Sequence, residues 1–364
     1  MKYSYKIFSI NGIELDLHIT FIGLFVLLVL VSFPQMYSVI LFGLLFLSVT
    51  VHELAHSLLA KSNNLSVNKI VLYPIGGAAQ IDDIPDDPSV ELQVAAIGPL
   101  TSLIIGVVFL LIHLIFPLQM TPTPLFIGTG FLFYDIGSLN IILAIFNLIP
   151  AFPMDGGRVL RASLTMWKKD LIGATQTAAS IGRFFALIMI AIGFLNNLWL
   201  VILGFFIYWG AAQELQGTKL TTLLKPIHVG DVMLPMDSVM TIAPTIPINH
   251  AFEMMFHNRV HDLIVCQNGK LLGVLTWNEI VKLPPEDRSN AIVADLMAKT
   301  VSILPERSVF DAYKLMAKEK VQLIPVIDNN APCNVMGVIT SQSIAYGLAI
   351  AQNFKNQGIS YARS

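Results

Sequence analysis

Long apolar segments dominate the first 216 residues and limit what this part of the chain can fold into. A helix that crosses the hydrocarbon core of a bilayer needs about 20 mainly apolar residues. Charged residues make up only 13% of the chain, against about 25% in soluble domains. The sequence predicts a polytopic α-helical membrane domain over residues 1–216, with six transmembrane helices over 17–33, 38–60, 91–116, 125–149, 177–195 and 198–213.

The basic residues of the membrane half lie beside alternate ends of the predicted spans. Cytoplasmic loops carry an excess of Lys and Arg, and the connections 34–37, 117–124 and 196–197 contain neither. We therefore expect a multi-pass protein of the cell membrane with both termini in the cytoplasm. The basic residues that support this orientation are Lys2, Lys6, Lys61, Lys69, Arg158, Arg161, Lys168, Lys169 and Lys219.

Charge and cysteine content narrow the class of protein further. The net charge of −2 gives no reason to expect a nucleic-acid partner. The two cysteines, Cys266 and Cys333, both lie beyond the apolar half. Their number and position argue against a disulfide scaffold and fit a reducing cytoplasm.

The stretch 66–82, SVNKIVLYPIGGAAQID, follows the second predicted span and has the composition of short β segments. Pro74 and the pair Gly76-Gly77 interrupt it. An exposed strand edge beside a catalytic site can clamp an extended peptide. The alternative is a hairpin at the membrane surface that only packs, and the sequence supports both interpretations equally.

A tandem repeat follows the membrane half. VGDVM at 229–233 recurs as VADLM at 293–297, and GVLTWNEI at 273–280 recurs as GVITSQSI at 337–344. Each copy also contains a predicted helix and a predicted strand between these motifs. The sequence therefore predicts two small cytoplasmic α/β modules over 228–285 and 286–350, after a linker over 217–227 and before a polar C-terminal tail over 351–364.

His52, Glu53 and His56 form an HELAH motif inside the second predicted span. Residues four apart share one face of a helix, so the two histidines can present nitrogens to one metal ion. Glu53 can then accept the proton of an attacking water, as in other HExxH hydrolases. The alternative is a pair of hydrogen-bonded histidines. Ionisable residues inside a membrane span are costly and are functional by default, which favours the metal site.

The third metal ligand must come from another segment. Leu59 and Ser62 occupy the positions where the metzincin motif needs Gly and His. Residues 75–80, where a thermolysin-like acid is expected, contain no acid. The remaining candidates in the membrane half are His18, His113, Asp135 and Asp155.

Depth in the membrane separates these candidates. Asp155 lies just past the cytoplasmic end of the fourth predicted span, level with HELAH, where Pro150 and Pro153 exclude a regular helix. Such irregular backbone is tolerated in a membrane where it is buried in protein or faces a water-filled cavity. His113 and Asp135 lie at the wrong depth. Asp155 is the predicted third ligand, and His18 is an alternative for which a hydrogen bond is the expected role.

Three further polar residues lie near the predicted third ligand. Asn147, at the end of an apolar helix, can stabilise an oxyanion or position substrate, or alternatively make an interhelical hydrogen bond. Arg158 and Arg161 are expected to anchor the segment at the membrane interface.

HELAH and the segment NLIPAFPMDGGR (147–158) together resemble the site-2 protease family of intramembrane zinc metalloproteases. LHITF (17–21), PIGGAA (74–79) and AAIGP (95–99) occur in the family's order, and the resemblance covers about residues 1–216. It implies that His52, His56 and Asp155 bind one Zn²⁺ per chain and that Glu53 is the catalytic acid/base. It also implies that the substrates are single-span membrane proteins, often anti-sigma factors or membrane-tethered regulators.

The tandem repeat resembles paired CBS domains, which an archaeal and bacterial branch of the family carries in place of a PDZ domain. Such pairs bind ATP, AMP or related adenosine ligands, with a Thr or Ser and a later Asp contacting the nucleotide. Thr276 and Thr340 match this pattern, whereas Glu279 and Ser343 stand where Asp is usual. Thr276, Glu279 and Thr340 are therefore candidate nucleotide-binding residues. A structural role, with homodimerisation through the CBS pair, is the alternative.

The predicted function is an intramembrane zinc endopeptidase that cleaves transmembrane segments of single-span proteins within the lipid bilayer, modulated through its CBS pair. The alternative is a zinc-binding membrane sensor or transporter that is gated by a nucleotide-binding CBS module. Against the alternative, polar residues spread across the depth of the bilayer, as a transport path needs, are sparse in this chain.

Overall fold

The structure is a computed structural model that describes residues 4–33, 36–73, 76–81, 85, 87–120, 129–267, 270–298, 301–328 and 335–356. It divides into two compact units, Met1–Thr218 and Lys219–Ser364. Several features of the sequence analysis lie outside the described residues, among them Lys2, Pro74, Cys333, the start of the predicted fourth span (125–128) and the end of the predicted tail (357–364).

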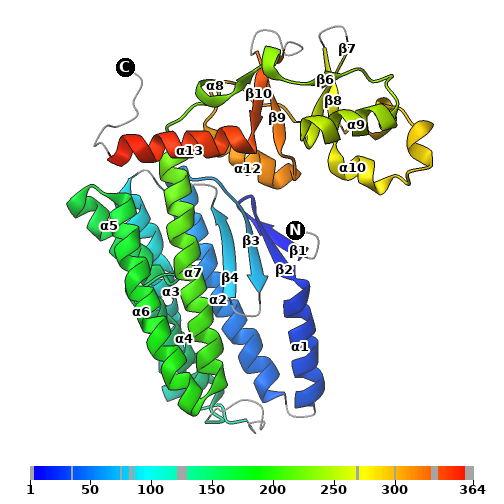
Figure 1. The fold of residues 1–364 in the computed structure, drawn as a ribbon. Coiled ribbons are helices and arrows are strands. Elements are labelled where there is room, and N and C mark those ends of the chain that lie inside the picture. Colours follow the sequence, from blue (N-terminus) through cyan, green and yellow to red (C-terminus); the bar gives the residue numbers. More distant parts are fainter. Residues whose placement is uncertain are drawn as a thin grey trace. The chain divides into compact units, whose positions relative to one another are not determined.

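Apolar helices form most of the first unit (Figure 1). They expose large apolar side chains, such as Leu114 at 78% and Leu195 at 85%, a surface that suits lipid better than water. Two shorter apolar helices are α1 (Ile19–Ser32) and α4 (Leu132–Asn147). Within the described ranges, four helices are long and apolar enough to cross a membrane: α2 (Tyr37–Ser62), α3 (Pro88–Ile115), α6 (Leu171–Asn196) and α7 (Leu198–Leu224).

Several helix boundaries differ from the predicted spans. The first helix begins at Ile19, not at residue 17, because the preceding residues belong to a β-strand. The fourth begins at Leu132 and has 16 residues. The helix α6 begins at Leu171, earlier than the predicted residue 177. The six helices that were predicted as spans are present, and crossing by the two short ones stays a prediction.

The last helix of the first unit extends into the predicted linker. α7 continues to Leu224, so most of the stretch 217–227 is helical. Gly217 lies inside the helix and costs only about 1 kcal/mol relative to Ala. Pro226 disfavours helical backbone at the residue before it, Lys225. The helix α7 ends one residue earlier, at Leu224.

A four-stranded sheet completes the first unit, in the order β1-β2-β3-β4. The β2 and β3 strands are parallel and the other two pairs are antiparallel. The β segments expected over 66–82 are present, whereas the N-terminal hairpin was not predicted. Its signal is Asn11-Gly12, both at positive φ, which is the favoured composition of a two-residue hairpin turn. The strands are β1 (Ser4–Ile10), β2 (Ile13–His18), β3 (Val67–Tyr73) and β4 (Gly76–Ile81).

The chain between α4 and α5 (Asp155–Lys168) is irregular. Pro150 and Pro153 lie in this stretch, where proline removes helical hydrogen bonds. The side chain of Phe152 is 1% exposed. This buried, non-helical segment delivers the chain to Asp155, the first residue of α5.

The second unit contains the two predicted α/β modules. In the first module, β6-β7-β8 form a sheet beside α9, and in the second, β9 and β10 pair beside α12. The helices and strands that the repeat predicts are α9 (Ile248–Asn258), β7 (Asp262–Gln267), β8 (Lys270–Thr276), α12 (Val309–Glu319), β9 (Leu323–Ile327) and β10 (Val335–Thr340).

One strand pairing joins the two modules, and the remaining elements of the second unit are mostly short. β5 precedes the first module's strands in sequence but pairs with β10 of the second. α13 (Ser341–Asn356) runs past residue 350, so the predicted polar tail begins inside a helix. The remaining elements are α8 (Val229–Val232), β5 (Leu234–Pro235), β6 (Thr241–Ile242), α10 (Trp277–Lys282), α11 (Val293–Leu296) and the 3-10 turns Met236–Ser238 and Asp287–Ser289.

Candidate metal centre

His52 and His56 lie one turn apart on α2, and both are 4% exposed. The helical period alone places their side chains on one face. Their Nε2 atoms are 3.1 Å apart. Two imidazoles so close in a buried site present their lone pairs to one point.

Asp155 joins this pair from α5. Its Oδ2 lies 3.2 Å from Nε2 of His52 and 3.2 Å from Nε2 of His56. The ligand atoms of the three residues all lie within 4.8 Å of one another. The structure therefore brings together the three residues that were predicted as metal ligands.

The helix α3 orients both histidines through their second ring nitrogens. Nδ1 of His52 lies 2.9 Å from Oγ of Ser102, and Nδ1 of His56 lies 2.5 Å from the carbonyl oxygen of Val94. A carbonyl oxygen only accepts, so His56 carries its proton on Nδ1 and keeps Nε2 free as a ligand. Such outer partners fix the tautomer and the ring orientation of metal-binding histidines.

Gly98 leaves the space that this centre occupies. A β-carbon built at Gly98 would overlap Nε2 of His56 and would lie 2.7 Å from Nε2 of His52. Val94, Gly98 and Ser102 recur every fourth residue along one face of α3. Sequence analysis noted AAIGP but missed these roles, because a backbone carbonyl and a missing side chain carry no chemical signature of their own.

The three ligand atoms fit a zinc ion. A tetrahedral ion with bonds of about 2.0–2.1 Å separates its ligands by about 3.3 Å, close to the separations of 3.1–3.2 Å between the three atoms. Two imidazoles and one carboxylate are a common zinc donor set that leaves a fourth position open.

Glu53 lies between the histidines in sequence and against the sheet in space. A β-carbon built at Gly77 of β4 would overlap Cγ of Glu53 and would lie 3.2 Å from its Oε1. Only a glycine lets the strand pass so close to this carboxylate. β4 is the last strand of its sheet, so an edge strand borders Glu53.

The other candidate ligands are engaged elsewhere. Nδ1 of His18 lies 2.8 Å from Oγ1 of Thr20 and caps α1, as the expected hydrogen bond requires. Asp135 accepts from Tyr37 and from the backbone N–H of Thr129. His113 packs against aromatic rings, with its centroid 5.3 Å from that of Phe131.

Arg161 differs from expectation, whereas the oxyanion role of Asn147 stays a prediction. Nδ2 of Asn147 donates to the carbonyl of Leu143 in its own helix, 3.1 Å away, not to another helix. Arg161 was expected at the interface, but this prediction is wrong because its side chain is 3% exposed and pairs with Glu91. The structure gives Arg158 intermediate burial on the same helix.

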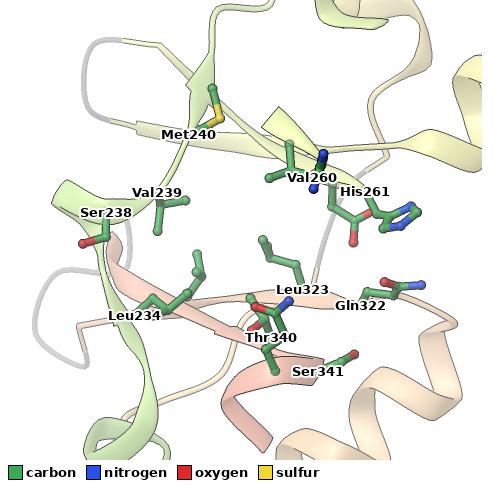
Figure 2. A pocket seen from close by; sticks show the side chains of 14 residues that line it. Leu234, Ser238, Val239, Met240, Val260, His261, Gln322, Leu323, Thr340 and Ser341 are labelled. Atoms are coloured by element: carbon green, nitrogen blue, oxygen red, sulfur yellow. The ribbon is translucent and has the colours of Figure 1, made fainter. Parts of the chain in front are cut away.

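A separate cleft opens in the second unit, between the two modules. Figure 2 shows Val260 and His261 on one side of it, with Thr340 and Ser341 on the other. Oγ1 of Thr340 also accepts from the backbone N–H of Ser343. Thr276 instead accepts from the N–H of Glu279 at the start of α10. The cleft lining includes Thr340, and it includes neither Thr276 nor Glu279.

Charged side chains also line this cleft. Arg259 offers a cation, and Asp262 lies close by along the chain. Burial raises the pKa of Asp262, and a hydrogen bond from the Gln322 backbone, which lowers the pKa, opposes this rise only in part. Oδ2 of Asp262 has no hydrogen-bond partner within the described part of the chain.

Comparison with known proteins decides the family. A zinc metalloprotease of Methanocaldococcus jannaschii is 35% identical over 355 residues, which cover 97% of this chain and 98% of that protein. The model of peptidase family M50 matches residues 40–123 and 118–191. This chain belongs to peptidase family M50, the site-2 protease family.

A second relative agrees with this assignment. The M50 peptidase is 27% identical to a putative zinc metalloprotease of Synechocystis, over 85% of this chain and 83% of that one. A solved site-2 protease from Methanocaldococcus jannaschii is 44% identical and covers 58% of this chain and 95% of its own, with a TM-score of 0.47. The CBS domain model matches residues 229–286 and 293–349. The M50 peptidase is thus a multi-pass membrane metalloprotease with two CBS domains.

Proposed function

We propose that this M50 peptidase is an intramembrane zinc endopeptidase that hydrolyses peptide bonds within transmembrane segments of single-span membrane proteins. The observation that carries the proposal is the triangle of His52 Nε2, His56 Nε2 and Asp155 Oδ2, with sides of 3.1–3.2 Å, inside a unit built of apolar helices. A site at this position meets substrates that are themselves in the bilayer.

The residues divide the chemistry between them. His52, His56 and Asp155 would hold the Zn²⁺ ion, which supplies a water activated at neutral pH and polarises the scissile carbonyl. Glu53 accepts the proton of the attacking water and donates it to the nitrogen of the leaving amine. Asn147 would place its amide N–H toward the developing oxyanion.

The edge strand beside Glu53 supports a means of substrate binding. A transmembrane helix satisfies its own backbone groups and hides its peptide bonds, so the substrate must unwind before cleavage. An unwound segment has free N–H and C=O groups that can pair with an exposed strand edge. We assign this role to β4, whose Gly77 borders the Glu53 carboxylate.

The second unit supports a regulatory role. We assign to the cleft between the CBS domains an adenosine nucleotide, ATP or AMP, with Arg259 near its phosphates and Thr340 as a hydrogen-bonding partner. Nucleotide binding there would modulate proteolysis. The alternative role for the CBS pair is to join two chains as a homodimer. The distribution of basic residues supports cytoplasmic termini.

The test combines metal analysis with a cleavage assay on a single-span reporter in detergent. Glu53→Gln should keep its zinc and lose cleavage by a factor of about 100 or more. Asp155→Asn should lower zinc content, whereas Asp135→Asn, a buried acid outside the centre, should leave it unchanged. Full cleavage by Glu53→Gln would overturn the mechanism. Zinc transport by liposomes that contain the inactive variant would favour the transporter alternative.

A further inference from the structure

A buried group of charges lies beside the metal centre and takes no part in the proposed chemistry. Arg161 on α5 donates through Nε and Nη2 to Oε1 of Glu91 on α3, at 2.7 and 2.5 Å. Both side chains are almost fully buried, at 3% and 5% exposed. The same guanidinium donates through Nη1 to Glu214 at 2.8 Å and to Thr218 at 3.1 Å, both on α7.

Stability alone does not account for this arrangement. Removing two charges from water costs several kcal/mol per ion, and apolar pairs of similar volume are often as stable or more so. A buried ion pair is better suited to fixing one geometry, because its donors and acceptors tolerate few alternative positions. The question is which geometry this pair fixes.

Glu91, the acid of this ion pair, lies on α3, the helix that orients both histidines. Glu91 precedes Val94 by about one turn of α3, and Gly98 and Ser102 continue the same face. Val94 and Ser102 hold the rings of His56 and His52. A side chain that binds Glu91 therefore binds α3, the helix that sets the orientation of both histidine rings.

Arg161, the base of this ion pair, lies on α5, the helix that begins with Asp155. Arg161 lies six residues further along α5, a rise of about 9 Å. Its guanidinium also lies 5.0 Å from the ring centroid of Phe152, in the irregular segment just before Asp155. Arg161 thus reaches from α5, which follows Asp155, to the irregular segment that precedes it.

We infer that the Arg161–Glu91 ion pair is a positioning device that holds Asp155 at ligand distance from His52 and His56. The pair ties α5 to α3, so the carboxylate from one helix and the imidazoles oriented by the other meet at a fixed separation. Arg161 touches neither metal nor substrate and acts through Asp155. This inference rests on the proposed zinc site.

The test separates positioning from stability with a variant that keeps the volume and removes both charges of the buried pair. Glu214, whose side chain is 30% exposed, can then be solvated by water. In Glu91→Leu/Arg161→Met, we expect wild-type thermal stability in detergent but a zinc Kd at least tenfold higher by chelator competition, the size of loss that follows when groups that orient metal ligands are removed. The value of kcat should fall in parallel while KM stays constant. Arg161→Lys keeps one cation but loses the two-nitrogen clamp, and its zinc Kd should rise about threefold to tenfold.

Tyr37→Phe is the matched control, because it removes a buried polar contact between α2 and α4 away from the centre. It should lower thermal stability and leave the zinc Kd unchanged. A wild-type zinc Kd in the folded double variant overturns the inference; if that variant does not fold, a wild-type zinc Kd in Arg161→Lys overturns it. Failure of the wild-type protein to bind zinc would refute the proposed function instead.

Discussion

Gly98 and His56 lie so close that no β-carbon fits between the α3 backbone and the Nε2 atom of the imidazole. The proposed metal centre therefore depends on an absent side chain as much as on its ligands. Gly98→Ala should fill the space in which the two histidines converge. We expect the variant to lose most of its zinc, as measured by elemental analysis, and its proteolysis with it.

Gly43 provides the control for this prediction. It lies on α2 and a β-carbon built there meets nothing within 4 Å. Gly43→Ala should retain zinc and activity. Because Ala favours the helix over Gly, the substitution should stabilise α2 by about 1 kcal/mol or less. Equal zinc contents in the two alanine variants would contradict the steric role of Gly98.

Ser102→Ala tests the orientation of His52. Loss of the hydroxyl removes the partner of Nδ1, which lies 2.9 Å away. The zinc Kd should rise by about tenfold to a hundredfold, as is typical for partners of ligating histidines. Within the described residues, the hydroxyl of the neighbouring Thr101 donates to the carbonyl of Ile97 in its own helix, so Thr101→Ala should bind zinc as the wild type does. A wild-type Kd for Ser102→Ala would mean that the hydroxyl does not orient the ring.

Asn147→Ala tests the oxyanion role that was predicted from the sequence. The amide now donates within α4 to Leu143 and has a second N–H for substrate. The kcat should fall by a factor of about 100 to 1,000, with KM and zinc content unchanged. A parallel loss of zinc would instead indicate that Asn147 supports the irregular segment before Asp155.

Thr340→Val and Thr276→Val form a matched pair in the second unit. Each threonine caps a helix, so each change costs a similar amount of local stability, about 1 kcal/mol. Thr340 lines the cleft and Thr276 does not. ATP or AMP affinity, measured by calorimetry, should fall about threefold to tenfold for Thr340→Val and stay constant for Thr276→Val. The reverse order would assign the nucleotide to another surface.

Asp262 gives a prediction for pH dependence. Burial raises its pKa above the ordinary value, which is about 3.9, so the unfolded chain ionises first. The free energy of unfolding of the second unit should then fall as pH rises from about 4 through the raised pKa. Asp262→Asn removes this loss and should stabilise the unit by about 1 kcal/mol at pH 8.

The gain from Asp262→Asn should shrink toward pH 4.5, where the wild-type carboxyl is increasingly neutral in the folded protein. Thermal unfolding of the full chain in detergent at several pH values measures it. The control is Asp237→Asn at an exposed position, which should leave the free energy of unfolding of the second unit at pH 8 as in the wild type. A constant gain for Asp262→Asn at every pH would show that its ionisation is not the cause.

The sequence by itself determined the parts of this protein that depend on local periodicity and composition. The spacing of His52 and His56 places both on one face of a helix, and apolar length predicts helices that can span a membrane. The repeated motifs predict two α/β modules. Segment boundaries were less certain, because strand pairing at Leu17 and helix continuation past Gly217 depend on neighbours and on small free-energy differences.

Only the tertiary structure decided how separate segments meet. Depth and backbone arguments selected Asp155, but its distances of 3.2 Å to both histidines arise from the packing of α5 against α3. Every residue has a backbone carbonyl, and that of Val94 gains its role only from its position beside His56. Arg161 looked like a surface anchor, and its burial against Glu91 depends on an acid 70 residues away. Contacts between distant residues leave no periodic trace in the chain, so only the fold reveals them.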